Sequence, residues 1–204
     1  MDKKELIINT LDEIINEGLG NSCSVSEIAK RAGIAKGGIY YYFKSKDEIL
    51  DTLITEKYAT IIAKCNSVTQ LSHLSPTQKL EQVFITYYSE QMNHEFDILL
   101  HEPQYAHLHQ KSLAHIVKSM TPIISSIFEE GNQSKDFNVT YPVEFSEFIL
   151  TNFAFLFDPG IFTWNKEEVI LKLQSLSVII ERMLELPDGS MYFLVSTFEN
   201  RNKR

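Results

Sequence analysis

Cysteine is scarce in this chain of 204 residues, which contains only Cys23 and Cys65 and no Cys-x-x-Cys motif. Neither a disulfide framework nor a structural zinc site is therefore predicted. Long apolar runs are also absent, since no stretch approaches the roughly 18 residues that a membrane-spanning helix needs. Residues 1–4 lead into an amphipathic pattern and not into the apolar core of a signal peptide. We therefore expect a soluble cytoplasmic protein that does not associate with membranes.

Motifs of catalysis and of cofactor binding are missing as well. The sequence has no glycine-rich phosphate loop, no paired-carboxylate motif and no Ser/His/Asp or Cys/His signature. Histidines gather at His101, His107, His109 and His115, near Glu102. However, His107 and His109 are two residues apart on a predicted helix, so their side chains point in different directions. We therefore predict no enzyme, no bound cofactor and no metal site.

The net charge of −8 opposes DNA binding only if it is evenly spread. Residues 1–46 carry seven basic and six acidic side chains, whereas residues 47–204 carry 12 basic and 21 acidic ones. Within residues 21–46 the imbalance is sharper, with five basic side chains against Glu27 alone. A basic module thus precedes an acidic body, although charge alone also allows a solvated face with no partner.

Apolar spacing and N-terminal capping signals predict an all-α protein. The helix-start signals are Asp2 with Glu5, Ser24 with Glu27, Ser45 with Glu48, Ser75 with Gln78, and Asn165 with Glu168. The predicted helices span residues 3–17, 24–32, 36–43, 45–66, 76–92, 95–101, 106–130, 142–157 and 166–185. We expect a kink at Pro122, a short helix in the apolar segment 191–198, and disorder over residues 200–204.

Residues 24–43 have the pattern of a helix-turn-helix. Ala29 is small enough for two helices to cross closely, and Gly33 can adopt the positive φ that the turn needs. Ile39 is the apolar anchor of the second helix. With the helix of residues 3–17, the motif predicts a three-helix DNA-binding bundle.

The second helix of this motif presents Lys36, Gly37 and Gly38 outward. A helix of this kind suits the major groove, where lysine can donate to guanine O6 and N7. The two glycines allow close approach to bases, and each costs about 1 kcal/mol relative to alanine, so the helix should be loose without DNA.

Further DNA contacts are predicted around this helix. Tyr40 and Tyr42 can donate to phosphates, Lys44 and Lys46 can neutralise them, and amides near Ser24 and Ser26 offer another phosphate site. For each of the two lysines, a solvated position without a partner is an equal alternative. Tyr41 is expected to lie partly in the core. The predicted DNA-binding set is Ser24, Ser26, Lys36, Gly37, Gly38, Tyr40, Tyr41, Tyr42, Lys44 and Lys46.

Residues 24–50 closely resemble the N-terminal domain of the tetracycline-repressor (TetR/AcrR) family of bacterial one-component regulators. The matching residues are Glu27-Ile28-Ala29, Ala32-Gly33, Lys36-Gly37, Ile39-Tyr40-Tyr41-Tyr42-Phe43 and Lys46. The resemblance implies that residues 36–38 face bases and that Tyr40, Tyr42, Lys44 and Lys46 face the DNA backbone. Two residues depart from the family pattern: Ala35 replaces a frequent Ser or Thr cap, and Gly38 replaces a side chain that often touches a base.

The same resemblance gives expectations for the rest of the chain. Residues 1–46 would form the DNA-binding domain, and residues 47–204 a larger helical domain for effector binding and dimerisation. The helices at 142–157 and 166–185 would pair with their mates in a four-helix homodimer interface, so that the dimer reads a near-palindromic operator. The predicted lining of a site for an apolar or aromatic effector is Phe84, Tyr88, Phe96, Tyr105, Phe128, Asn152 and Phe153.

Together these features predict a ligand-responsive DNA-binding transcriptional regulator. The preferred hypothesis is a dimeric repressor that a small effector releases from its operator by tilting the helix that follows the DNA-binding domain. The alternative is a DNA-binding interaction protein that a protein partner controls, without any small ligand.

Overall fold

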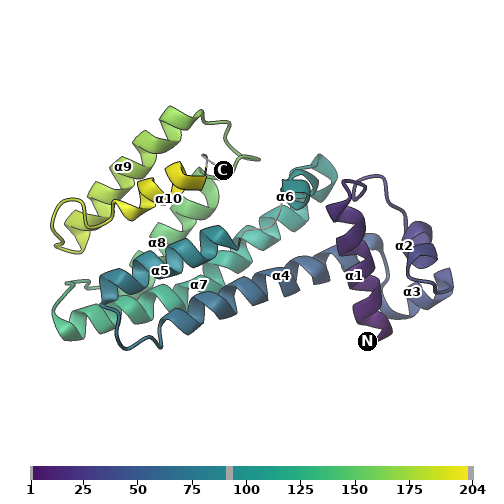
Figure 1. Cartoon of the computed structure of the whole chain (residues 1–204), viewed down its shortest axis with the longest axis horizontal. Helices are drawn as coiled ribbons and strands as arrows, with labels where there is room; N and C mark the ends of the chain where they lie inside the picture. The colour runs from purple at the N-terminus through teal and green to yellow at the C-terminus, as the bar shows by residue number, and fades with distance from the viewer. Residues whose placement is uncertain (1, 91–93, 202–204) are drawn as a thin grey trace. The chain divides into compact units, whose positions relative to one another are not determined.

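The computed structural model describes residues 2–90 and 94–201, in which all regular elements are helical (Figure 1). The predicted all-α fold is thus confirmed. The elements are α1 (Lys3–Asn16), α2 (Val25–Arg31), α3 (Lys36–Tyr42), α4 (Lys46–Val68), α5 (Pro76–Ser89), α6 (His94–Leu100), the 3-10 helix η1 (Pro103–Tyr105), α7 (Ala106–Ser134), α8 (Pro142–Thr151), the π-helix η2 (Asn152–Leu156), α9 (Lys166–Met183) and α10 (Phe193–Arg201). Among the described helices, none combines the length and the apolar character needed to cross a membrane.

The chain packs into two compact units. The first comprises residues 1–60 and 91–112, and the second comprises residues 61–90 and 113–204. The boundaries after residues 60 and 112 fall inside α4 and inside α7, so each of these helices has residues in both units. These units reflect packing, whereas the expected boundary after residue 46 concerns which residues bind DNA and which bind an effector. That functional boundary stays a prediction.

The core of the first unit is built on the apolar face of α1. Ile7, Leu11 and Ile14 of this helix are fully buried, as their helical spacing predicts. They belong to one cluster with Ile28 of α2 and Ile39 of α3, which is the predicted bundle. The cluster is larger than predicted, because α4, α6, η1 and α7 also contribute the buried residues Ile49, Leu50, Leu53, Ile54, Phe96, Leu99, Leu100, Tyr105 and Leu108.

Helix starts follow the capping signals in most places. Complete capping boxes join Ser75 to Gln78 and Asn165 to Glu168, and the Ser24 hydroxyl accepts a bond from the Glu27 amide. The box predicted at Asp2 is wrong, because the Asp2 side chain makes no capping bond although α1 begins at the next residue. Burial of the apolar face of α1 stabilises this helix without a side-chain cap.

The second unit departs from the predicted helices in one segment. The helix expected over residues 142–157 is wrong as a single α-helix, because α8 ends at Thr151 and residues 152–156 form the π-helix η2. At the end of this π-helix, the Leu156 carbonyl accepts a bond of 2.9 Å from the Trp164 indole instead of continuing a regular helix. Pro122 lies within α7, which does not end there, and the kink stays a prediction.

The C-terminal segment forms a helix of its own. α10 packs against α5 and α9, and Met191, Leu194 and Val195 are buried (Figure 1). The short helix expected in residues 191–198 is therefore confirmed. The disorder expected from residue 200 onward is wrong for Asn200 and Arg201, which belong to α10, while residues 202–204 lie outside the described residues.

Both cysteines are buried and free. Burial, together with the charge of Glu90, raises the pKa of the Cys65 thiol to about 11. A thiol with such a pKa stays protonated and unreactive at neutral pH.

Candidate nucleic-acid interface

The turn between α2 and α3 has the geometry that its residues predict. Gly33 adopts a φ of +66°, and the Ile34 amide donates to the Ala29 carbonyl across 3.0 Å. Ala29 and Ile39 are both buried at the helix crossing. Lys36 and Gly37, at the start of α3, are exposed.

The tyrosines of α3 lie differently from the prediction. Tyr41, expected to be partly in the core, is 82% exposed, and Tyr40 is 51% exposed. The inward positions are taken by Ile39 and Phe43, which are four residues apart and therefore share one helix face. Tyr42 is only partly buried but packs against the core, with its ring edge to face with that of Tyr41 at 4.8 Å between centroids. Tyr40 and Tyr41 thus present the larger free surfaces.

Packing among residues 2–90 and 94–201 does not require the two glycines of α3. A Cβ added to Gly37 or Gly38 would meet nothing within 4 Å, and neither residue has a positive φ. By contrast, a Cβ at Gly131 would lie 2.0 Å from the Phe137 ring, so internal packing requires that glycine. Two glycines in a seven-residue helix each cost about 1 kcal/mol relative to alanine. No contact among the described residues offsets this cost.

The positive charges around α3 fall into two groups. Arg31 is bound by Glu17 at 2.5 Å and by Glu27 at 3.1 Å, and these hydrogen bonds raise its pKa. Lys30, Lys36 and Lys44 are exposed, and within residues 2–90 and 94–201 no ion pair occupies their ammonium groups. Neither Lys30 nor Arg31 is in the predicted DNA-binding set, and the sequence does not show that only Arg31 is neutralised.

Lys46 is engaged inside the first unit. Its ammonium donates to the Gly20 carbonyl across 2.6 Å and lies over the Tyr105 ring, 5.6 Å from the centroid. A phosphate would have to compete with both contacts. The sequence could not indicate them, because Gly20 and Tyr105 lie far from Lys46 along the chain.

The start of α2 supplies the two predicted serines. Ser24 is the N-cap residue, and its hydroxyl accepts from the Glu27 amide at 3.2 Å. Ser26 is exposed in the first turn. The Ser26 hydroxyl is thus on the surface, whereas the Ser24 oxygen already has a partner.

The seven residues predicted to line an effector site are divided between the two units. Phe96 and Tyr105 lie in the core of the first unit. In the second unit, Phe128 is buried against Phe137 and Phe145, and Asn152 is exposed and donates to the Phe148 carbonyl.

The other three residues form an aromatic cluster in the second unit. The ring of Phe84 lies 5.5 Å from that of Tyr88 and 5.4 Å from that of Phe153, measured between centroids. Phe193 and Phe157 extend this cluster, at 5.8 Å from Phe84 and 5.6 Å from Phe153. Neither residue belongs to the predicted lining, although the apolar segment 191–198 was a signal for Phe193.

The predicted absence of a metal site concerned the histidines between His101 and His115. In the first unit, the rings of His101 and His109 lie edge to face with 4.8 Å between centroids. Structural or catalytic zinc takes three or four protein ligands, so this pair does not by itself make a zinc site. The absence of a metal stays a prediction.

Family models match both parts of the chain. Residues 12–53 match the bacterial regulatory proteins of the tetR family, and residues 88–179 match the tetracyclin repressor-like C-terminal domain. The chain belongs to the TetR family. Members of this family are transcriptional regulators, so the chain is a DNA-binding regulator that acts as a dimer and responds to a small molecule.

Individual proteins are similar to this TetR-family regulator over most of its length, in sequence or in fold. The fatty acid metabolism regulator protein of Bacillus subtilis is 28% identical over 181 residues, which are 87% of this chain and 91% of the relative. A TetR/AcrR-family regulator from Thermobifida fusca has the same fold, with a TM-score of 0.59 and 21% identity over 78% of this chain and 87% of that one. The regulator FadR of Bacillus subtilis, crystallised with stearoyl-CoA, gives a TM-score of 0.58 and 23% identity over 96% and 95% of the two chains.

The exposed Lys44 and the engaged Lys46 predict different salt responses for this TetR-family regulator. Lys44→Ala is expected to lower the slope of log Kd against log salt concentration by about one per half-site, because each phosphate contact releases about one counterion. Lys46→Ala is expected to change the slope less and to lower the melting temperature, because its ammonium is held by Gly20 and Tyr105. Fluorescence anisotropy with labelled operator at several salt concentrations measures both slopes. Equal slope changes would mean that Lys46 leaves its internal contacts to bind phosphate.

Proposed function

We propose that this regulator is a repressor that leaves a near-palindromic operator when a long acyl chain, carried as acyl-coenzyme A, binds its second unit. The name of the 28% identical relative and the stearoyl-CoA in the FadR crystal structure support this ligand class. The cluster of Phe84, Tyr88, Phe153, Phe157 and Phe193 supplies apolar side chains of the kind that an acyl chain would contact. The protein would act in the cytoplasm by binding alone, without catalysing a reaction.

The observation that carries the DNA-binding role is the open surface over Gly37 and Gly38. A helix without side chains at these positions can bring its backbone close to base edges and thymine methyl groups. Lys36 at the start of this helix would donate to guanine, and Lys30 and Lys44 would contact phosphates. We keep residues 1–46 as the DNA-binding domain and residues 47–204 as the domain for effector binding and dimerisation.

The response to an effector would pass along α4. This helix begins at Lys46 in the first unit and ends at Val68 in the second. An effector that favours another direction of α4 would change the separation of the two α3 helices in the dimer, and operator affinity would fall. Operator DNA must then weaken effector binding by the same factor.

Selection of binding sites from random and genomic DNA at a fixed salt concentration tests this proposal. The purified protein is expected to enrich a near-palindromic site, and Lys36→Ala is expected to lose the preference for guanine at one position of each half-site. Each such contact contributes about 1–3 kcal/mol of discrimination. Tyr42 is less suitable for this test, because it packs against the core and its loss would disturb the fold. Enrichment of no sequence would contradict the assignment of α3.

The selected operator then serves to test the ligand. Stearoyl-CoA is expected to release the protein from the operator, with a change in Kd of roughly 5- to 150-fold, while free coenzyme A leaves the Kd unchanged. Release by neither compound, with intact operator binding, would exclude this acyl-CoA as the effector. Release by an added protein partner would then favour the alternative function, control without a small ligand.

A further inference from the structure

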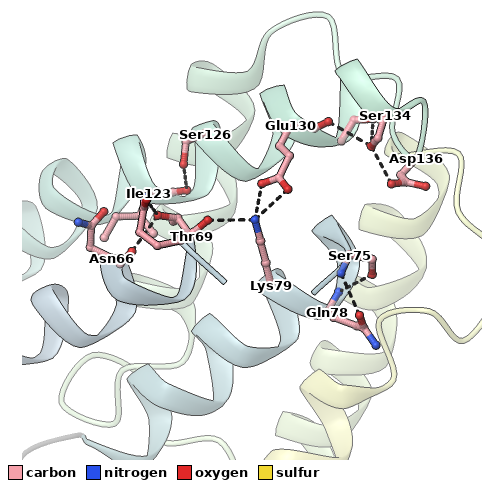
Figure 2. Close-up of polar contacts among 12 residues, drawn as sticks. Asn66, Thr69, Ser75, Gln78, Lys79, Ile123, Ser126, Glu130, Ser134 and Asp136 are labelled. Atoms are coloured by element: carbon pink, nitrogen blue, oxygen red, sulfur yellow. Dashed lines mark hydrogen bonds and ion pairs between the residues drawn. The ribbon is translucent and has the colours of Figure 1, made fainter. Parts of the chain in front are cut away.

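Lys79 of α5 is a buried cation with three oxygen partners. Its side chain is 4% exposed, and its ammonium lies 2.8 and 2.7 Å from the two carboxylate oxygens of Glu130 on α7. It also donates to the Thr69 carbonyl across 2.9 Å. Figure 2 shows the Lys79 side chain extending between Thr69 and Glu130. All three residues belong to the second unit.

The Thr69 carbonyl lies directly beyond the last residue of α4, Val68. The final carbonyls of a helix have no partner within the helix, and the negative end of its dipole favours a cation there. The Thr69 hydroxyl also donates to the Asn66 carbonyl at 2.8 Å, which closes the same turn (Figure 2). Lys79 therefore fastens the C-terminal end of α4 to both α5 and α7.

Stability alone does not explain a lysine in this position. Removing an ammonium from water is costly, and apolar residues of similar volume often replace buried ion pairs without loss of stability. What an apolar residue cannot supply is a directed hydrogen bond from α5 to the end of α4. The three donors of the ammonium group match the three oxygen atoms around it.

We propose that Lys79 is a positioning residue that holds the C-terminal end of α4 in one place and thereby fixes the direction of this helix. The separation of the two α3 helices in the dimer then has one preferred value. Lys79 thus determines how strictly the protein discriminates between operators that differ in half-site spacing. The inference rests on dimeric operator binding and not on the identity of the effector.

Lys64 provides a matched control within the same unit. It lies on α4 and pairs with Glu90 just beyond α5 at 2.7 Å, but its side chain is 49% exposed. An exposed pair of this kind contributes little, because water and salt screen it. Lys64→Met therefore removes the same charge and an ion pair between neighbouring segments without touching the end of α4.

The test compares the Kd values for the selected operator and for the same operator with one base pair inserted between its half-sites. In Lys79→Met the ratio of the two Kd values is expected to fall by about 2- to 30-fold, the range seen for residues that carry coupling. Lys64→Met is expected to keep the wild-type ratio. Glu130→Gln, which retains the Lys79 bond to Thr69 but weakens the ion pair, is expected to give an intermediate ratio.

Each result decides the proposal. A lower ratio in Lys79→Met, with the control unchanged, supports it. An equal change in both Kd values, or no change, would overturn it, because a merely structural role scales both affinities alike. Lys79→Met should fold, since the Glu130 carboxylate is 43% exposed and keeps its hydration. If it does not fold, Glu130→Gln decides by the same ratio.

Discussion

Replacing Gly37 and Gly38 together by alanine is expected to make the protein more stable and its operator binding weaker. In α3 neither glycine has a positive φ, and an added methyl group meets nothing within 4 Å. Alanine is better than glycine in a helix by about 1 kcal/mol per residue, so the double variant should gain about 1–2 kcal/mol. For a protein of this size, that gain corresponds to roughly 2–8 °C in melting temperature.

The same double variant is expected to bind the operator more weakly. Two methyl groups on the exposed turn of α3 would keep its backbone away from the bases. The loss should be comparable to that of a mismatched base pair, about 1–3 kcal/mol per half-site, and therefore roughly thirtyfold or more for a dimer. Differential scanning calorimetry measures the stability, and fluorescence anisotropy measures the operator Kd.

Gly33→Ala is the matched control for this pair of measurements. It adds the same methyl group in the same motif, where nothing lies within 4 Å, but at a φ of +66°. An L-residue is strained in that conformation, so this variant should lose about 1 kcal/mol of stability. Unchanged operator affinity in the double variant, together with the expected gain in stability, would show that α3 does not approach DNA closely at these glycines.

Placing charges on the exposed apolar face of α9 is expected to separate the dimer. Leu171 and Ile179 are eight residues apart on α9 and are 65% and 54% exposed, and Val178 between them is also exposed. On α8 and η2, Phe148 and Phe155 are likewise exposed. An unpartnered apolar stripe of this extent marks an interaction surface, and the family acts through dimers.

The variant Leu171→Glu, Ile179→Glu brings four carboxylates into each dimer interface. Burying an unpaired charge costs several kcal/mol, so the variant should be monomeric at micromolar concentration. A single half-site then has to supply all the binding, and operator affinity should fall by about a hundredfold or more. Analytical ultracentrifugation gives the mass, and anisotropy gives the Kd.

The control variant Leu71→Glu places a carboxylate at an exposed leucine outside both helices and should leave the mass and the Kd unchanged. A double variant that stays dimeric would place the interface elsewhere.

The sequence allowed prediction of those parts of the fold that depend on neighbours along the chain. The turn at Gly33, the caps at Ser24, Ser75 and Asn165, and the buried face of α1 all follow from spacings of three to seven residues. These interactions are local, so the residue pattern contains most of the necessary information. The helix-turn-helix and the family resemblance both follow from such patterns.

The side-chain contacts that the sequence did not predict join residues that are far apart along the chain. Lys46 meets Gly20 and Tyr105, and Lys79 meets Glu130, which is 51 residues away. No local pattern indicates such partners, so the sequence could not distinguish a free lysine from an engaged one. The prediction that Tyr41 lies partly in the core was wrong for a related reason. The packing of its neighbours decides which face of α3 turns inward.

The core of the first unit also determines whether the predicted DNA-binding domain, residues 1–46, can fold in isolation. Beyond residue 46 this core takes in Ile49 and Leu50 of α4, Phe96 and Leu99 of α6, and Leu108 of α7. A fragment that ends at residue 46 would expose the apolar surface that these side chains cover. Residues 1–46 alone therefore cannot be transferred to another regulator as an independently folding DNA-binding domain. A DNA-binding fragment that folds alone would have to include residues 47–60 and 94–112, or a substitute for the apolar surface they bury.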